Sequence, residues 1–230
     1  MLGGDLAVAL FDLDNTLLAG DSDYAWGQFL ITVGAVDRAR YEHANGRFYD
    51  AYKAGTLDIG EFLAFALEPL RRIPQSQLLA WRARFVEECV RPMIKPWAAP
   101  LLESYRAQGV TLALVTATND FVTAPIAELF GIPHLVATVA ERRNGHFTGR
   151  CGGVPCFREG KVTRVRSWMA DHGLAWADSV FYSDSHNDLP LLEAVSRAVA
   201  VDPDPTLLAI AEQRGWEILR SEPPPQALFA

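Results

Sequence analysis

Short, continuous apolar runs recur along the chain, and stretches with helical spacing separate them. A run of this kind is typical of a strand that is buried on both faces of a parallel sheet. The predicted strands are 6–11, 110–115, 135–139, 179–182 and 198–201. Segments 96–108 and 121–130 have helical spacing and each is followed by a glycine, a common helix stop. Strands that alternate with helices predict an α/β fold with a doubly wound, Rossmann-like parallel sheet.

Residues 19–92 break this alternation, because they contain no strand-like run and place apolar residues such as Trp26 and Phe29 at helical spacing. We therefore expect an all-helical cap domain at 19–92, inserted into an α/β core domain made of 1–18 and 93–222. Asn144-Gly145 predicts a tight hairpin turn. The prolines at 223–225 predict a terminal extension.

Composition narrows the class of protein. Half of the 230 residues are apolar, and 21 basic against 28 acidic residues give a net charge of −7, which disfavours nucleic acid as a partner. No apolar run is long enough for a membrane span, and the first residues lack the basic segment of a signal peptide. Three cysteines fit a reducing compartment, so a cytoplasmic location is expected. Cys151 and Cys156 have only His146 as an obvious further ligand, which disfavours zinc.

Two acidic clusters follow predicted strands. Asp12 and Asp14 come directly after the first strand, and Asp184, Asn187 and Asp188 follow the fourth. Functional groups of open α/β sheets lie beyond the carboxyl ends of the strands, so these side chains should share one crevice. Carboxylates that close repel unless a cation joins them, and oxygen ligands suit Mg²⁺. The structural alternative makes them turn and helix-cap residues, but it leaves Asp184 unexplained.

Two further pieces lie between the clusters. Thr116 and Ala117 end a strand and open a helix, where backbone N–H groups can bind a phosphate. Lys161 stands at the start of another predicted helix and could neutralise an anion. Each is weak alone, because such a threonine is usually a helix cap and such a lysine is usually solvated. Together with the acidic clusters they supply the nucleophile, metal, hydroxyl and fixed positive charge of phosphoryl transfer.

The order Asp-x-Asp-x-Thr, Thr, Lys, Ser-Asp-x-x-Asn-Asp resembles the haloacid dehalogenase superfamily of phosphatases. The likeness is to its subfamily IB, the phosphoserine-phosphatase-like branch with a helical cap after the first motif, and it covers residues 6 to about 201. This resemblance implies an enzyme that hydrolyses a small-molecule phosphate monoester with Mg²⁺ through an aspartyl-phosphate. It also implies that Asp12 is the nucleophile and Asp14 the general acid and base.

The resemblance implies supporting roles as well. Thr16 would help to orient Asp14, and the substrate- and phosphate-binding residues would be Thr16, Thr116, Ala117 and Lys161, together with Asn187 and Asp21. Magnesium would be held through Asp12, the main-chain carbonyl of Asp14, Asp184 and Asp188, with Asn187 supporting metal and phosphate.

The substrate is less closely defined. Asp21 lies where phosphoserine phosphatases carry a glutamate for the substrate's ammonium group, which favours an amine-bearing substrate, although Asp21 could equally cap the first cap helix. The cap arginine for a substrate carboxylate has no counterpart in 55–67, so phosphoserine is disfavoured unless Arg71 or Arg72 reaches the site. Two stretches, 18–26 and 155–161, resemble a bacterial subgroup that includes histidinol-phosphate phosphatases.

Other readings stay open at this point. A phosphoserine phosphatase or a phosphotransferase of the same fold would need the same motifs. From another class, the chain could be a non-catalytic module that binds a phosphorylated ligand, since fold does not fix function. His186 could contact the substrate or face solvent, and the oligomeric state is undetermined.

Overall fold

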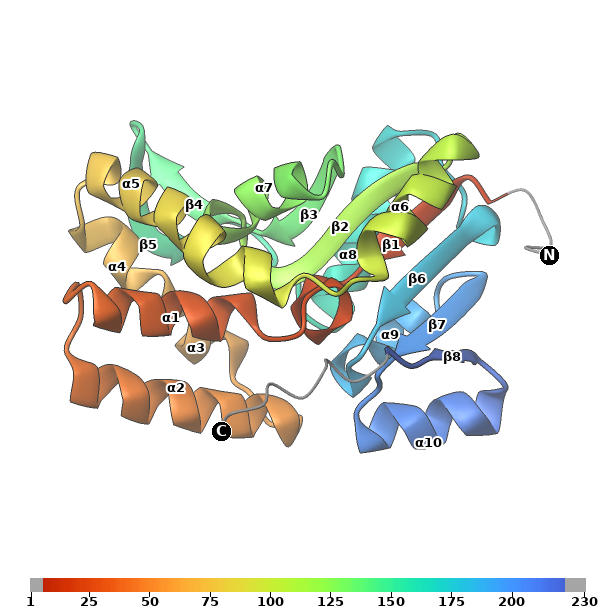
Figure 1. Cartoon of the computed structure of the whole chain (residues 1–230), viewed down its shortest axis with the longest axis horizontal. Helices are drawn as coiled ribbons and strands as arrows, with labels where there is room; N and C mark the ends of the chain where they lie inside the picture. Colours follow the sequence, from red (N-terminus) through yellow and green to blue (C-terminus); the bar gives the residue numbers. More distant parts are fainter. Residues whose placement is uncertain (1–5, 222–230) are drawn as a thin grey trace, which may run out of the picture.

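The computed structural model describes residues 6–221, so the expectations about the first five residues and about the proline tail lie outside the described residues. Its centre is a parallel sheet with strand order β3-β2-β1-β6-β7-β8 (Figure 1). The strands are β1 (Val8–Phe11), β2 (Thr111–Asn119), β3 (His134–Thr138), β6 (Ser179–Ser183), β7 (Arg197–Val201) and β8 (Glu217–Leu219). All five predicted strands are present, and the doubly wound α/β fold is confirmed.

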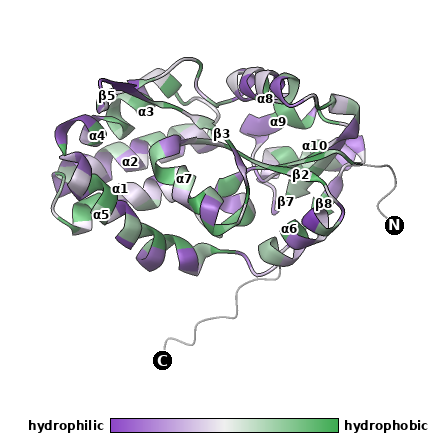
Figure 2. Cartoon of the chain, turned by 90° about the horizontal axis from the view of Figure 1, so that it is seen from above, coloured by the Kyte–Doolittle hydropathy of each residue, from purple (hydrophilic) through white to green (hydrophobic). Residues whose placement is uncertain are grey.

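Helices cover both faces of the sheet. They are α6 (Ala98–Ala107), α7 (Asp120–Leu129), α8 (Glu159–Asp171), α9 (Leu189–Leu192) and α10 (Pro205–Arg214). Side chains alternate along β1, so that Phe11 packs with residues of α6 and α7 while Leu10 packs with residues of α8, α9 and α10. Burial on both faces explains the continuous apolar run of this strand. The surrounding helices alternate between hydrophilic and hydrophobic residues (Figure 2).

The segment between β1 and α6 is helical, as expected. It contains α1 (Ser22–Thr32), α2 (Arg38–Lys53), α3 (Ile59–Ala66), α4 (Glu68–Arg72) and α5 (Gln75–Phe85). Aspartates start the first three, because Asp21, Asp37 and Asp58 accept hydrogen bonds from main-chain N–H groups of the first turn. The division into a cap at 19–92 and a core at 1–18 and 93–222 stays a prediction, and we use both names below in this sense.

A hairpin lies beside the sheet and next to the cap helices. Strands β4 (Ala140–Arg143) and β5 (His146–Cys151) are antiparallel, and their turn has φ of 50° at Asn144 and 81° at Gly145. The predicted hairpin is therefore confirmed, since a two-residue turn of this kind requires positive φ at both positions. Helix α4 packs against β5, with the Arg71 side chain over Gly149. None of the helices within 6–221 is both long and apolar enough to cross a membrane.

Candidate active site

Asp12 lies at the carboxyl end of the central strand and is 7% exposed. Its N–H still donates to the Tyr182 carbonyl of β6 at 2.9 Å, which fixes the residue at the sheet edge. One carboxylate oxygen accepts from Lys161 Nζ at 3.0 Å, and the other lies 3.2 Å from the Thr16 hydroxyl. Both oxygens of this carboxylate are therefore oriented by neighbours from distant parts of the chain.

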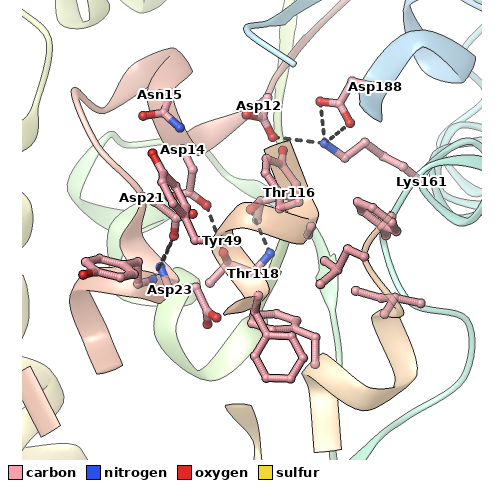
Figure 3. A pocket seen from close by; sticks show the side chains of 18 of the residues that line it. Asp12, Asp14, Asn15, Asp21, Asp23, Tyr49, Thr116, Thr118, Lys161 and Asp188 are labelled. Atoms are coloured by element: carbon pink, nitrogen blue, oxygen red, sulfur yellow. Dashed lines mark hydrogen bonds and ion pairs between the residues drawn. The ribbon is translucent and has the colours of Figure 1, made fainter. Parts of the chain in front are cut away.

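Lys161 stands in the first turn of α8 and is 2% exposed. Its ammonium group lies between two carboxylates, 3.0 Å from Asp12 Oδ1 and 2.7 Å from Asp188 Oδ1 (Figure 3). Burial raises the pKa of Asp12 to about 7, although the charge of Lys161 opposes this rise. Burial would lower the pKa of Lys161, but the two carboxylates raise it well above its usual range. The lysine is thus a permanent positive charge at this point.

Asp14 points away from this ion pair and toward the cap. Its carboxylate accepts hydrogen bonds from the Ser22 N–H at 2.6 Å and from the Thr118 hydroxyl at 2.9 Å. Burial, followed by the charge of Asp21, raises the pKa of Asp14 to about 7. A carboxyl group that titrates near neutral pH can both give and take a proton there.

Thr16 has different neighbours from those that the resemblance implied. Its hydroxyl lies 3.2 Å from Asp12 Oδ2 and 3.3 Å from Asp184 Oδ1, and it accepts from the Asp184 N–H at 3.1 Å. Within residues 6–221 no hydrogen bond joins Thr16 to Asp14. The expectation that Thr16 orients Asp14 is therefore corrected: the turn at 13–17, with φ of 56° at Asn15, directs the two side chains to different partners.

Asp12 and Asp184 converge on Thr16, and this pair is the part of the site suited to a cation. Burial and then the charges of Asp12 and Asp188 raise the pKa of Asp184 well above its usual range. Among the described residues, no three His, Cys, Asp or Glu side chains are grouped to hold a metal ion. The reason is that Asp14 turns to Ser22 and Thr118, while Asp188 is bonded to Lys161 and to the Ser183 hydroxyl.

The other predicted phosphate ligands divide into two groups. Thr116 and Ala117 line the same cavity as Asp12, Asp14 and Lys161, and the Thr116 hydroxyl accepts from the Thr118 N–H at 3.1 Å. Asn187 does not line this cavity. Its Oδ1 accepts from Arg158 and its Nδ2 donates to the Tyr52 carbonyl, so the amide is directed toward the cap.

The cavity has a volume of about 70 Å³, which is enough for several water molecules. Its cap side is aromatic and acidic. Aromatic lining residues are Tyr24, Phe48, Tyr49, Tyr52, Phe62 and Phe157. Lys161 is the one lysine or arginine among the described lining residues. Arg71 and Arg72, which a substrate carboxylate would need, do not line the cavity.

Two carboxylates belong to this cap side. Asp21 does cap α1, since its Oδ1 accepts from two N–H groups of the first turn at 2.9 Å, and it also lines the cavity. Asp23 has one long contact, 3.5 Å from Asn119 Nδ2, and burial and the charges of Asp21 and Asp14 raise its pKa well above its usual range. Asn45, also in the lining, is buried and its Nδ2 makes no hydrogen bond.

Comparison with known proteins decides the family. The family model of the haloacid dehalogenase-like hydrolases matches residues 9–193, which include every motif described above. The chain belongs to this family. The prediction that it is a phosphatase of the haloacid dehalogenase type is also confirmed.

This hydrolase is similar to a curated protein and to solved structures over most of its length. The histidinol-phosphatase of Neisseria meningitidis serogroup C (strain 8013) is 42% identical over 216 residues, which are 92% of this chain and 97% of that protein. A solved structure of a Bordetella pertussis Tohama I protein of unknown function is 47% identical, with a TM-score of 0.86 over 92% of this chain and 97% of that one. A phosphoserine phosphatase, solved as a phospho-aspartyl intermediate analogue, shares the fold at 17% identity, with a TM-score of 0.70 and 95% of each chain covered.

Several contacts of the site in this hydrolase were not anticipated. Ser22 and Thr118 hold Asp14, Ser183 holds Asp188, and Arg158 holds Asn187. Ser183 is the serine of the Ser-Asp-x-x-Asn-Asp motif and Thr118 directly follows Ala117, so their positions near the strand ends were a usable signal. The contacts of Ser22 and Arg158 had no such signal, because each depends on how distant segments come together.

Proposed function

We propose that this phosphatase hydrolyses a small-molecule phosphate monoester with Asp12 as the nucleophile and Mg²⁺ as the cofactor. The observation that carries the proposal is the environment of Asp12. The buried carboxylate has a fixed cation on one oxygen and the Thr16 hydroxyl, which also contacts Asp184, beside the other, and it lines the cavity. An ionised carboxylate in such a place can attack phosphorus, because the positive charge reduces repulsion from the phosphate oxygens.

Magnesium would be held by the carboxylates of Asp12 and Asp184, with the main-chain carbonyl of Asp14 as a further oxygen ligand. The donor set is suitable, since all of these are hard oxygen atoms and the raised pKa of Asp184 reflects buried negative charge that a cation would offset. When bound, the ion would neutralise charge on the phosphate. Asp188, already paired with Lys161, would support the site by fixing the lysine.

The chain's own residues account for both halves of the reaction. Lys161, Thr116 and the main chain at Ala117 would hold the phosphoryl oxygens. Asp12 forms a bond to phosphorus as the ester P–O bond breaks, and Asp14 gives its proton to the leaving alkoxide. Asp14 then takes a proton from the water that attacks the aspartyl-phosphate, which releases phosphate and restores Asp12. The pKa of Asp14, raised to about 7 by burial and by Asp21, suits both transfers.

We propose an amine-bearing substrate without a carboxylate, such as histidinol phosphate. The cap side of the cavity supports this choice, because it carries Asp21 and Asp23 beside aromatic walls and contributes no arginine to the lining. An organic cation would offset the charge of the two carboxylates, and rings favour it further. A substrate carboxylate such as that of phosphoserine would meet like charge there. The named Neisseria relative supports the same substrate.

The test is phosphate release from histidinol phosphate, phosphoserine and glycerol phosphate, with Mg²⁺ and with EDTA. We expect Mg²⁺-dependent release that is fastest with histidinol phosphate and abolished by Asp12→Asn. Asp171→Asn, an exposed change on α8, is the matched control and should keep full activity. Undiminished release by Asp12→Asn would refute the nucleophile. Equal rates of phosphate release from all three esters would refute the substrate assignment. Transfer of the phosphoryl group to an added alcohol, without release of free phosphate, would indicate a phosphotransferase.

A further inference from the structure

Arg158 lies directly before α8 and has an unusual main-chain conformation, with φ of 49° and ψ of −122°. Residues other than glycine seldom adopt this region, and such residues gather at functional sites. The Arg158 guanidinium donates from Nε and Nη2 to Asn187 Oδ1 at 3.1 and 3.0 Å, and from Nη2 to the Gly55 carbonyl. Neither acceptor is charged. The strained arginine thus connects Gly55, which follows α2 in the cap, to Asn187 of the core loop 185–188.

The same core loop has further contacts with the cap. Asn187, 2% exposed, donates from Nδ2 to the Tyr52 carbonyl at 3.1 Å, and the Tyr52 hydroxyl donates to Ser185 Oγ at 3.1 Å. Tyr52 also lines the cavity. The next residue after Asn187 is Asp188, whose carboxylate holds Lys161. A short chain of bonds therefore runs from the cap, through Arg158 and Asn187, to the loop that positions Lys161.

We propose that Arg158 is a positioning residue that latches the cap over the cavity and orders the loop carrying Asp188. The latch consists of Tyr52, Gly55, Arg158, Ser185 and Asn187. Its role in turnover rests on the proposed function. Arg158 does not line the cavity, so it acts through Asn187 and Asp188 rather than on substrate. Hydrogen bonds of this kind replace bonds to water, so the latch can close and reopen during turnover.

Gly55 provides an independent reason to infer a close approach at this point. Its φ is 67°, and a Cβ there would lie 2.9 Å from His186 Nε2 and 3.3 Å from Arg158 Nη2. A side chain at this position would have to displace the ends of the His186 and Arg158 side chains, and so would disturb the Arg158 hydrogen bonds. Gly34, also in the cap segment, has φ of 70°, and no atom lies within 4 Å of the position that a Cβ would take there. The two glycines thus share their backbone demand and differ in the contact alone.

The experiment compares Arg158→Gln, Gly55→Ala and their double variant with two controls, Gly34→Ala and Arg47→Gln. Arg47 is an exposed arginine of α2 that pairs with Glu61 and does not touch the core loop. The measurements are kcat and KM for the best phosphate ester, and hydrogen exchange at 49–56 and 185–188. Arg158→Gln and Gly55→Ala should each lower kcat/KM about tenfold. Each change breaks hydrogen bonds of the charged Arg158 guanidinium, and a hydrogen bond that involves a charged group is worth about that factor. Both should speed exchange in the two segments together.

The double variant separates a shared latch from two unrelated defects. We expect its kcat/KM to be about equal to that of the less active single variant, because both changes break the same closure. Multiplied losses would overturn the proposal, as would unchanged exchange at 49–56 in Arg158→Gln or faster exchange spread over the whole sheet. Hydrogen exchange is read without substrate. If the wild type releases no phosphate from any ester, the proposed function fails, while exchange in the two segments still decides the latch.

Discussion

Replacement of Lys161 by methionine tests how much the buried charge cluster depends on its one cation. The side chain is 2% exposed, and its Nζ lies 3.0 Å from Asp12 Oδ1 and 2.7 Å from Asp188 Oδ1. Methionine fills a similar volume but leaves two buried carboxylates facing each other. Loss of one partner of a buried ion pair costs about 3–5 kcal/mol of unfolding free energy. In a chain of this length that corresponds to a melting temperature lower by about 6–20 °C.

The loss should depend on pH in a defined direction. Burial raises the pKa of Asp12 to about 7 even while Lys161 opposes the rise, and removal of the lysine raises it further. A carboxyl group with a raised pKa contributes stability that is present below its unfolded pKa and is lost as pH rises through the folded value. In Lys161→Met a proton can replace the lysine at low pH. The loss should therefore be largest above pH 7 and smaller at pH 5.

Urea unfolding at pH 5 and pH 8, in EDTA to exclude divalent ions, measures both effects. Lys53→Met, an exposed change on α2, is the control for removal of a lysine charge. Adding Asp188→Asn to Lys161→Met should recover part of the loss at pH 8, because one of the two carboxylates is gone. A loss below about 1 kcal/mol at pH 8, or an equal loss at both pH values, would refute this reasoning.

Three further changes test other contacts. Thr118→Val removes a hydrogen bond that lowers the pKa of Asp14, so kcat should fall about tenfold and its pH profile should move to higher pH; an unmoved profile would contradict the role of Asp14. Asp23→Asn should lower kcat/KM about tenfold for histidinol phosphate and leave glycerol phosphate within about twofold, and parallel losses would exclude Asp23 from amine recognition. Gly145→Ala, at φ of 81°, should cost about 1 kcal/mol in urea unfolding without changing kinetics, whereas Asn144→Gly should not destabilise.

Much of the fold could be predicted from the sequence, because strands buried on both faces appear as continuous apolar runs. Strand β8 was missed since it is short, lies at the sheet edge and begins with the exposed Glu217. The end of β2 was also misjudged. Residues 116–119 include three polar side chains and were expected to leave the strand, but they continue it to Asn119, which pairs with Thr138 of β3. Thr116 and Thr118 stay in this strand because they line the cavity, where Thr118 donates to Asp14, while the Asn119 side chain caps α7.

The candidate site was predictable where it depends on strand ends and unpredictable where it depends on side-chain direction. Asp12 and Asp188 follow adjacent strands, so their approach follows from the topology. The partners of Thr16 depend on the positive φ of Asn15, and those of Asn187 depend on where the cap lies. Both are three-dimensional facts that no local pattern contains. The catalytic roles of these residues stay predictions.

Asp12 and Asp14 illustrate how neighbours can divide two chemical roles between similar groups. Burial raises the pKa of each to about 7, yet Asp12 faces Lys161 while Asp14 faces two neutral donors and Asp21. A divalent cation beside Asp12 would lower its pKa and keep it ionised for attack. Asp14 has no cation among its described partners, so its pKa stays raised and it can carry the proton that the leaving group needs. The hydrogen-bond partners, rather than the shared residue type, therefore separate the proposed nucleophile from the proposed acid.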